Sequence, residues 1–273
     1  MGRCHCLPDS LLNIQTIGGS QEAMLGIVNE VLLQEYGFTL AMTRTEKIQT
    51  YIYMDDGIYT GNRLRYDLTN GTDSIGWLSN CPSSQCTLWV YTIAGHTEGI
   101  SYVKKHIQDE VEEKQINVQR KTTLMINNTR NPRGEIGVLW PENIHGDPYI
   151  DSYIADLQVS SGKKIAANNL FRHTGISSQE KLFSSPEARR VVEKAFLQKG
   201  IQIVKASKNP TPSMRPLGFM PLVSLGFGTF FATYRNIANN CPLVLWWGDP
   251  DFPITHPFGQ WHPLLPRRTN SVV

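Results

Sequence analysis

The sequence predicts an α/β protein with a parallel, Rossmann-like sheet and a polar insertion in the middle of the chain. Apolar, strand-like runs alternate with helix-like segments over the first 115 residues, and this alternation is typical of parallel sheets with crossover helices. Regular patterning weakens after residue 115 and returns at residue 184. We therefore expect one domain over 1–273, with a core at about 10–115 and 184–268 and an insertion at about 116–183.

The composition is that of an ordinary globular protein, with 40% hydrophobic and 18% charged residues. The net charge of +2 gives no indication of nucleic-acid or anionic-membrane binding. The longest apolar stretch, 217–234, contains Pro221 and several glycines and serines, so we expect strands and turns there. No basic and apolar leader is visible. We expect a cytoplasmic protein without a membrane segment.

The first elements follow from short patterns. A strand with alternating polarity is followed by a Gly-Gly-Ser turn and a helix with one apolar face, which Gly37 closes. A short strand and a polar loop come next. The expected elements are strand 11–16, turn 17–20, helix 21–36, strand 38–42 and loop 43–47.

The remaining elements are expected by the same criteria. Ser185, Pro186 and Glu187 give a strong helix start, and Gly200 is expected to end that helix. The ranges are a strand from 51, a helix from about 62, strand 87–94, turn 95–99, helix 100–114, strand 122–126, helix 186–199, strands 201–204 and 228–234, and an apolar run 241–245.

Two adjacent acids, Asp55 and Asp56, follow an apolar run, and Thr60-Gly61 comes four residues later. If the strand ends at the acids, they lie at the carboxyl edge of the sheet, where open α/β folds bind ligands. A Thr-Gly turn at a helix start exposes backbone N–H groups that suit a phosphate. Two carboxylates that can bind sugar hydroxyls, next to a turn that can bind a phosphate, predict a site for a phosphorylated ribose.

The stretch from Tyr51 to Leu64 resembles the phosphoribosyl-diphosphate (PRPP) signature of type I phosphoribosyltransferases. The resemblance implies that Asp55 and Asp56 hold the ribose 2- and 3-hydroxyls. It also implies that Mg²⁺ is the cofactor, placed by these acids and bound mainly through substrate oxygens. Thr60, Gly61 and Asn62 would bind the 5-phosphate. Arg63 stands where the family usually has a second hydroxyl residue, and its guanidinium binds phosphate by charge instead.

Two further loops match the order of that family. Gly18, Gly19 and Ser20 lie where a diphosphate-binding loop follows the first strand, and Ser20 is also a good helix cap. Arg44 and Lys47 lie near the position of the lid loop, where they would contact the diphosphate.

The C-terminal part offers candidates for binding a base or another acceptor. Asn236 and Asn240 carry amides with both donor and acceptor groups, and Trp247 presents a face on which a base stacks. The alternative is that Trp246 and Trp247 fill the core.

The same region, with 182–187 and 191–200, resembles a divergent phosphoribosyltransferase-like branch found in bacterial anti-phage loci, some of them retrons. The resemblance implies a toxic effector that transfers a glycosyl group to an unidentified nucleotide, nucleic acid or protein. Its partners would be a reverse transcriptase with its DNA–RNA hybrid and a further defence subunit, in a homo- or hetero-oligomer. The alternative is a catalytically inactive sensor or docking subunit with the same fold.

Three other interpretations stay open. Tyr53 to Asp56 is also the metal-binding tetrapeptide of reverse transcriptases, although only 52 residues precede it. The acids could belong to a loop that caps a helix. Cys4, Cys6, Cys81 and Cys86 could bind zinc, but their spacing differs from that of common zinc fingers and reduced thiols are favoured.

Overall fold

The structure is a computed structural model. Its contacts divide the chain into two compact units, Met1–Ile126 (unit 1) and Asn127–Val273 (unit 2). Among the described residues, no helix is long and apolar enough to cross a membrane. The structure describes residues 10–15, 19–42, 49–70, 76–81, 85–129, 135–143, 146–162, 164–173, 180–233, 237–249 and 251–266.

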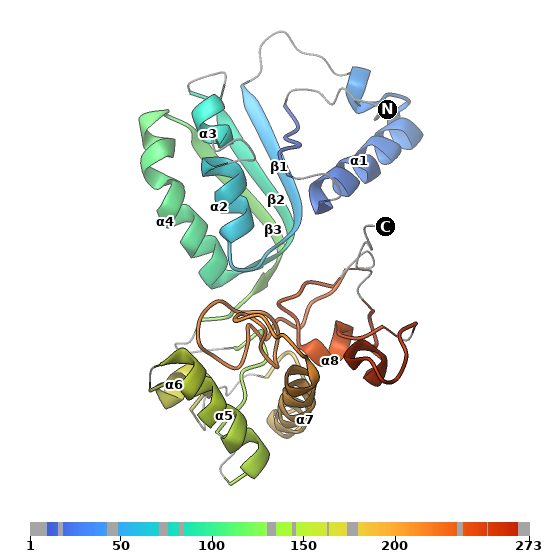
Figure 1. The fold of residues 1–273 in the computed structure, drawn as a ribbon. Coiled ribbons are helices and arrows are strands. Elements are labelled where there is room, and N and C mark those ends of the chain that lie inside the picture. The colour runs from blue at the N-terminus through green and yellow to red at the C-terminus, as the bar shows by residue number, and fades with distance from the viewer. Residues whose placement is uncertain are drawn as a thin grey trace. The chain divides into compact units, whose positions relative to one another are not determined.

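Unit 1 contains a parallel three-stranded sheet in the order β1-β2-β3 (Figure 1). The strands are β1 (Thr50–Ile58), β2 (Thr87–His96) and β3 (Asn117–Ile126). Both pairings are parallel, with Asp55 opposite Thr92. A parallel bridge from Leu11 to Ile52 extends the sheet beyond β1, so the run predicted as a strand at 11–16 contributes one bridge. The parallel α/β arrangement is confirmed.

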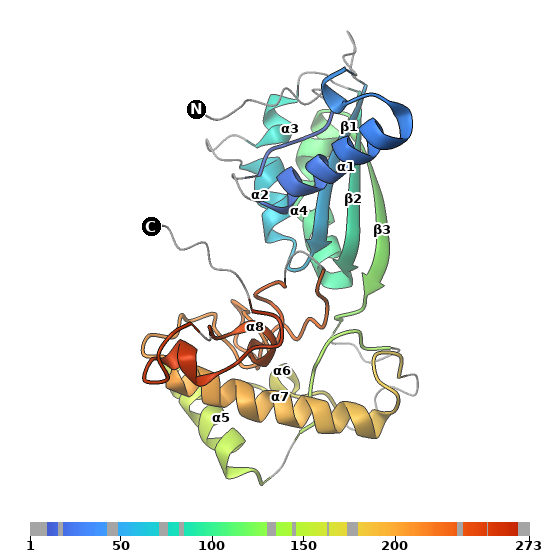
Figure 2. The same cartoon turned by 90° about the vertical axis from the view of Figure 1, so that its right-hand side faces the viewer.

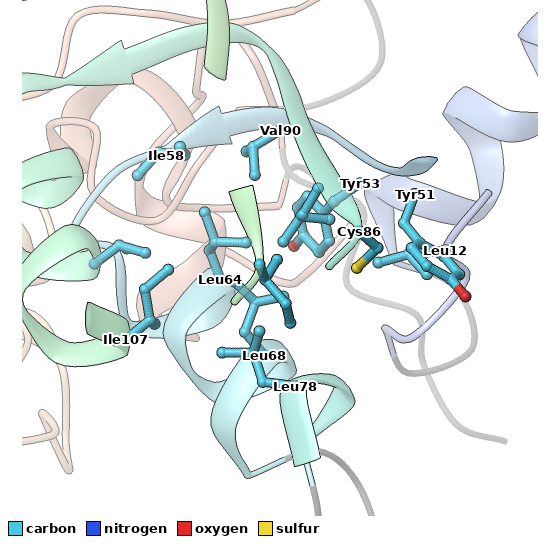
Figure 3. Close-up of a cluster of buried hydrophobic side chains, with 13 residues drawn as sticks. Leu12, Tyr51, Tyr53, Ile58, Leu64, Leu68, Leu78, Cys86, Val90 and Ile107 are labelled. Carbon is cyan, nitrogen blue, oxygen red and sulfur yellow. The ribbon is translucent and has the colours of Figure 1, made fainter. Parts of the chain in front are cut away.

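Helices α2, α3 and α4 pack against one another and cover one face of the sheet. Apolar side chains from these helices meet those of β1 and β2 in a common core, shown in Figure 3. Helix α1 contacts β1 and lies on the other side of the sheet, so that no described helix of unit 1 covers β2 and β3 there (Figure 2). The helices of unit 1 are α1 (Ser20–Tyr36), the 3-10 helix η1 (Leu40–Met42), α2 (Asn62–Thr69), α3 (Trp77–Asn80) and α4 (Thr97–Glu113).

Two predictions for unit 1 are wrong in detail. The short strand expected at 38–42 is instead a 3-10 turn over Leu40–Met42. The segment 117–126, expected within the polar insertion, forms β3 of the sheet. Most side chains of β3 are exposed because it is an edge strand. Its sequence is therefore polar and lacks the apolar run that would predict a strand. The end of α1 is confirmed: Gly37 has φ 73° and donates its N–H to Leu33 O at 3.1 Å.

Unit 2 is built mainly from helices and loops. Three isolated bridges, including Val138–Thr229 and Glu142–Arg172, are the β pairings among its described residues. Two apolar clusters form its interior, one around α5 and α7 and the other around α8. The helices are α5 (Pro148–Ser161), α6 (Ala167–Leu170), α7 (Pro186–Ala206), α8 (Leu243–Trp246) and the 3-10 helix η2 (Pro257–Gln260).

Helix α7 begins as predicted and ends later. Ser185 Oγ accepts the Ala188 N–H at 3.1 Å, and Pro186 is the first helical residue. The helix continues through Gly200 to Ala206, so the strand predicted at 201–204 is wrong. Gly200 is present because a Cβ there would lie 2.5 Å from Pro216 O, a close approach that leaves no space for a side chain.

The strand predicted at 228–234 does not form within the described residues 228–233. Within 228–233 the structure has isolated bridges at Thr229 and Ala232, and part of the apolar run 241–245 belongs to the short helix α8. Several residues of 228–233 are buried, which explains why the hydrophobicity of this segment suggests a strand.

A cluster of buried ion pairs holds unit 2 together. Arg189 bridges Glu180 and Glu193, and Arg172 bridges Glu142 and Glu193. The Arg189 guanidinium also donates to two carbonyls of the segment before α5, those of Ile136 at 2.7 Å and Val138 at 2.9 Å. Each buried charge therefore has an opposite charge within contact.

Candidate functional site

The acid pair lies inside β1 near its carboxyl end. The strand continues past Asp55 and Asp56 to Ile58, whereas the sequence predicts that it ends at the acids. Because successive side chains of a strand point to opposite faces, the two carboxylates are directed to opposite sides of the sheet. Asp55 is 5% exposed and Asp56 is half-buried. The two acids therefore have different environments.

Asp55 is held by neutral donors at both carboxylate oxygens. Its Oδ1 accepts hydrogen bonds from the Ser20 hydroxyl and from the Asp56 N–H, the latter at 2.8 Å. Its Oδ2 accepts from Gln15 Nε2 at 2.8 Å and lies 3.2 Å from the Tyr53 hydroxyl. These contacts bring the start of α1 to Asp55.

A second buried acid, Asp67 on α2, joins this network. The Tyr53 hydroxyl donates to Asp67 Oδ2 at 2.9 Å and accepts from Gln15 Nε2 at 2.8 Å. Burial, with a smaller contribution from the charge of Asp55, raises the pKa of Asp67 to about 6. Burial, with the two nearby acids, also raises the pKa of Tyr53, which keeps its phenol protonated. We call Gln15, Ser20, Tyr53, Asp55 and Asp67 the acid network.

One phenolic proton cannot serve both acids at once. With Asp67 ionised, the closer Asp67 oxygen takes the Tyr53 proton. Once Asp67 is protonated, it can donate to Tyr53, whose proton is then directed to Asp55 Oδ2. The raised pKa of Asp67 thus links its protonation to the hydrogen bond that Tyr53 makes with Asp55.

The turn after β1 is formed by two glycines in close contact. Gly61 has φ 81° and precedes the first residue of α2. A Cβ on Gly61 would lie 2.4 Å from Gly99 O, and a Cβ on Gly99 would lie 1.9 Å from Tyr59 O. The β1–α2 turn therefore rests on the first turn of α4, and two helix N-termini meet at the carboxyl ends of β1 and β2.

His96 ties these two strand ends together. It is fully buried, and its Nδ1 lies 3.1 Å from Ile58 O, which makes Nδ1 the protonated nitrogen. Burial lowers the pKa of His96 to about 4, so the ring is neutral at pH 7. This hydrogen bond joins the carboxyl ends of β1 and β2.

The predicted phosphate residues gather at this turn. Thr60 is half-buried, and its Oγ1 accepts the Asn62 N–H at 3.3 Å. Arg63 is exposed in the first turn of α2, and its charge lowers the pKa of Asp67 against the larger effect of burial. The connection from β1 is a turn and helix, which differs from the hairpin that the reverse-transcriptase alternative requires.

The predicted diphosphate loop is described only in part. Gly19 is the residue before α1 and Ser20 is its first helical residue. Ser20 donates to Asp55 and makes no side-chain cap, contrary to the capping role expected for it. Gly18, Arg44 and Lys47 lie outside the described residues.

The candidates for acceptor binding lie in unit 2. Asn240 donates Nδ2 to Phe219 O at 2.9 Å, and Trp247 packs on Phe258 at 4.7 Å between ring centroids. Trp246 is 7% exposed and donates its indole N–H to Cys241 O. Trp246 belongs to the buried cluster around α8, as the core alternative predicts, and Trp247 is half-buried and packs against that cluster. Asn236 lies outside the described residues.

The structure describes two of the four cysteines considered as zinc ligands. Cys81 and Cys86 have their sulfurs 3.5 Å apart, and burial raises the pKa of Cys86 to about 11. Within the described ranges, no group of three or more His, Cys, Asp or Glu side chains could hold a metal ion. Cys4 and Cys6 fall in the segment that is not described.

Sequence analysis missed Asp67, Gln15 and His96. Asp67 had a signal, because it stands between Leu64 and Leu68 on the apolar face of a helix, where a charge is unusual. Gln15 had none, since a glutamine in a short polar segment is unremarkable. The apolar strand before His96 suggested burial, but the predicted turn at 95–99 concealed it.

Unit 1 is thus a parallel α/β unit with a glycine turn and two helix N-termini at the carboxyl edge of its sheet, the edge at which open α/β folds bind ligands. The family model PRTase-CE matches residues 10–267. The chain therefore belongs to PRTase-CE, a phosphoribosyltransferase-like family. Searches of curated proteins and of solved structures give no significant match.

Proposed function

We propose that this protein is a phosphoribosyltransferase-like effector of bacterial anti-phage defence that binds PRPP or a related ribose phosphate with Mg²⁺. The observation that carries the proposal is the Thr60-Gly61 turn, which lies between Asp56 and the start of α2 and rests on the start of α4. Membership of PRTase-CE supports the same ligand class. We propose that the protein acts in the cytoplasm.

The 5-phosphate would bind at the turn after β1. Backbone N–H groups at Gly61 and Asn62 and the Thr60 hydroxyl are of the kind that bind a phosphate at a helix start. Arg63 would add charge from the first turn of α2. Gly61 allows the backbone to approach the ligand because its φ of 81° needs no side chain.

The two acids would have different roles toward the ribose. Asp56, half-buried and outside the acid network, would bind the sugar hydroxyls directly. Asp55 would do so by exchanging one donor, such as the Ser20 hydroxyl, for a ribose hydroxyl of the same chemistry. The exchange would couple binding of the sugar to the start of α1.

Magnesium fits this site only through Asp56 and the substrate. The carboxylate oxygens of Asp55 are occupied by neutral donors, and no ready cage of acids exists among the described residues. Bound Mg²⁺ would neutralise charge on the departing diphosphate. The Gly18–Ser20 loop, Arg44 and Lys47 would contact the same diphosphate.

The chemistry would be displacement at C1 of the ribose through an oxocarbenium-like state. The residues of this chain would contribute by holding the sugar, since positioning supplies much of the acceleration in such reactions. Asn236, Asn240 and Trp247 stay candidates for contacts with an acceptor. The second candidate function is an inactive sensor or docking subunit, which the full occupation of Asp55 favours.

Calorimetric titration of PRPP with Mg²⁺ tests the ligand. We expect the wild-type protein to bind and the Asp56→Asn variant to lose binding. Asp109→Asn, which changes an exposed acid on α4, is the matched control and should bind as wild type does. A folded wild-type protein that does not bind PRPP would contradict the substrate assignment.

Expression in a bacterial host tests the effector role. We expect wild-type protein to arrest growth and Asp56→Asn to be harmless at equal expression. Toxicity that is independent of Asp56 would favour the docking subunit.

Copurification tests the proposed partners, a reverse transcriptase with its DNA–RNA hybrid and a further defence subunit. We expect them to copurify with the protein, with residues 116–183 as the proposed contact region. We propose a homo- or hetero-oligomer, and a monomer that copurifies with neither chain nor nucleic acid would contradict this.

A further inference from the structure

The open face of the sheet in unit 1 carries a pair of stacked aromatic rings. Side chains of β2 alternate, so Leu88 and Val90 enter the core while Trp89 and Tyr91 point to the other face. The two rings have centroids 5.6 Å apart and an interplanar angle of 27°. Both are half-buried, and Ile93 beyond them is 41% exposed.

Parallel sheets are usually covered on both faces, so this face is unusual. In unit 1 the described helices α2, α3 and α4 cover the opposite face and α1 contacts β1 (Figure 2). Among the described residues, neither the Trp89 indole N–H nor the Tyr91 hydroxyl has a hydrogen-bond partner. The rings thus present unused polar edges as well as apolar surface.

The neighbouring strand adds positive charge. In the register of β2 and β3, Trp89 is paired with Gln119 and Tyr91 with Lys121. Lys121 and Arg120 are exposed, and within the described part of the chain neither forms an ion pair. Because successive side chains of a strand alternate, Lys121 lies on the face of the rings, whereas Arg120, which is paired with Val90, points to the opposite face. On β1, Asp56 points to the same face as the rings, toward the carboxyl end of the strand. Beside the rings, β3 therefore presents one cation, Lys121, and one amide, Gln119.

We propose that this face binds single-stranded nucleic acid, with bases stacked on Trp89 and Tyr91 and a phosphate near Lys121. Open sheets that stack bases on strand aromatics beside cationic side chains are an established way to hold single strands. Gln119 would reach base edges with its amide. Such binding would stand whether or not the protein transfers a ribosyl group.

Fluorescence anisotropy with labelled 12-mers of thymidylate and of uridylate measures the binding. We expect wild-type protein to bind, and Trp89→Leu/Tyr91→Leu to bind about tenfold or more weakly, because each stacked base is lost. Leucine keeps the strand apolar, and circular dichroism checks the fold. Tyr66→Leu, an exposed tyrosine on α2, is the matched control and should bind as wild type does.

Salt dependence separates the charge from the rings. Lys121→Gln should weaken binding and lower the slope of log K against log salt by about 0.7, the contribution of one phosphate contact on a single strand. No binding by wild type, or equal binding by the double leucine variant, would overturn the proposal. So would a wild-type dimer that the leucine variant dissociates and that binds no oligonucleotide, since the face would then bind another protein. Displacement of the 12-mer by an equal concentration of mononucleotide would also overturn strand binding.

Discussion

Unit 2 buries its charges as compensated pairs, whereas unit 1 buries two carboxylates beside neutral donors. Arg172 and Arg189 contact three glutamates in unit 2. In unit 1, Asp55 and Asp67 have no ion pair among the described residues, and the pKa of Asp67 is raised to about 6. Removing charges from water costs free energy in both units, and opposite charges offset part of that cost in unit 2, whereas neutral donors surround the carboxylates of unit 1.

The difference indicates which cluster belongs to a site. Buried acids with raised pKa values concentrate where a protein binds or transforms a ligand, because stability is given up for function there. The pairs of unit 2 join α7 to the segments at 136–142 and 172, which is a structural task. The acid network instead joins β1 and α2, the two elements that the proposed ribose-phosphate turn connects.

The largest loss of stability is expected from a substitution that breaks the ion-pair cluster of unit 2. Arg189→Met would leave Glu180 and Glu193 buried with one cation fewer, so we expect a loss of about 3–5 kcal/mol in the free energy of unfolding. Arg190→Met is the control, because that side chain is 49% exposed and should change stability by less than about 1 kcal/mol. Urea denaturation followed by circular dichroism measures both. Equal losses in the two variants would show that the buried pairs do not stabilise unit 2.

A smaller effect is expected at the turn of unit 1. Gly61→Ala would place a Cβ 2.4 Å from Gly99 O at φ 81°, and we expect a loss of about 2 kcal/mol or more. Gly37→Ala is the matched control. Gly37 has φ 73°, and no atom lies within 4 Å of the added Cβ. The left-handed backbone conformation alone should therefore lower the stability of this variant, by about 1 kcal/mol. If the control loses as much as Gly61→Ala, close packing of the turn is not what requires glycine.

The smallest expected effect is a gain in stability, and it is expected at Asp67. The folded-state pKa of Asp67, about 6, exceeds its ordinary value of 3.8, so the folded protein binds the proton more tightly than the unfolded chain does. The contribution of Asp67 to stability is therefore full below pH 4 and is lost as pH rises from about 4 to 6. Asp67→Asn keeps an acceptor for Tyr53 without the charge, so we expect it to gain about 1 kcal/mol at pH 7.5.

The pH dependence checks this assignment. Thermal unfolding at pH 4.5 and pH 7.5 should show that the gain of Asp67→Asn shrinks at the lower pH. Asp109→Asn changes an exposed acid and should leave stability within about 0.5 kcal/mol at both values. A variant that is less stable than wild type at pH 7.5 would indicate that ionised Asp67 is well solvated or paired.

Sequence patterns predicted the parts of the fold that follow from local chemistry. The parallel sheet, the Gly37 end of α1 and the Ser185 cap of α7 depend on periodicity and on single residues, and all three are confirmed. Gly200 and β3 were misjudged because their environment is tertiary. Gly200 faces a loop sixteen residues away in the chain, and β3 is a polar edge strand.

The candidate site was predictable only in outline. Asp56, Thr60 and Gly61 could be located from their spacing, since a strand, a turn and a helix start follow one another in the chain. The acid network could not, because Gln15, Ser20 and Asp67 approach Asp55 and Tyr53 from separate elements. No local pattern shows which of two adjacent acids a fold will bury.

Hydrogen exchange with and without PRPP and Mg²⁺ tests the central claim, that unit 1 holds a ribose-phosphate site at the carboxyl end of β1. We expect slower exchange in peptides that cover 19–25, 53–65 and 96–102. Peptides from α7, which carries the compensated cluster, should exchange at the same rate in both states. Protection confined to unit 2, or no protection at saturating PRPP, would contradict the account.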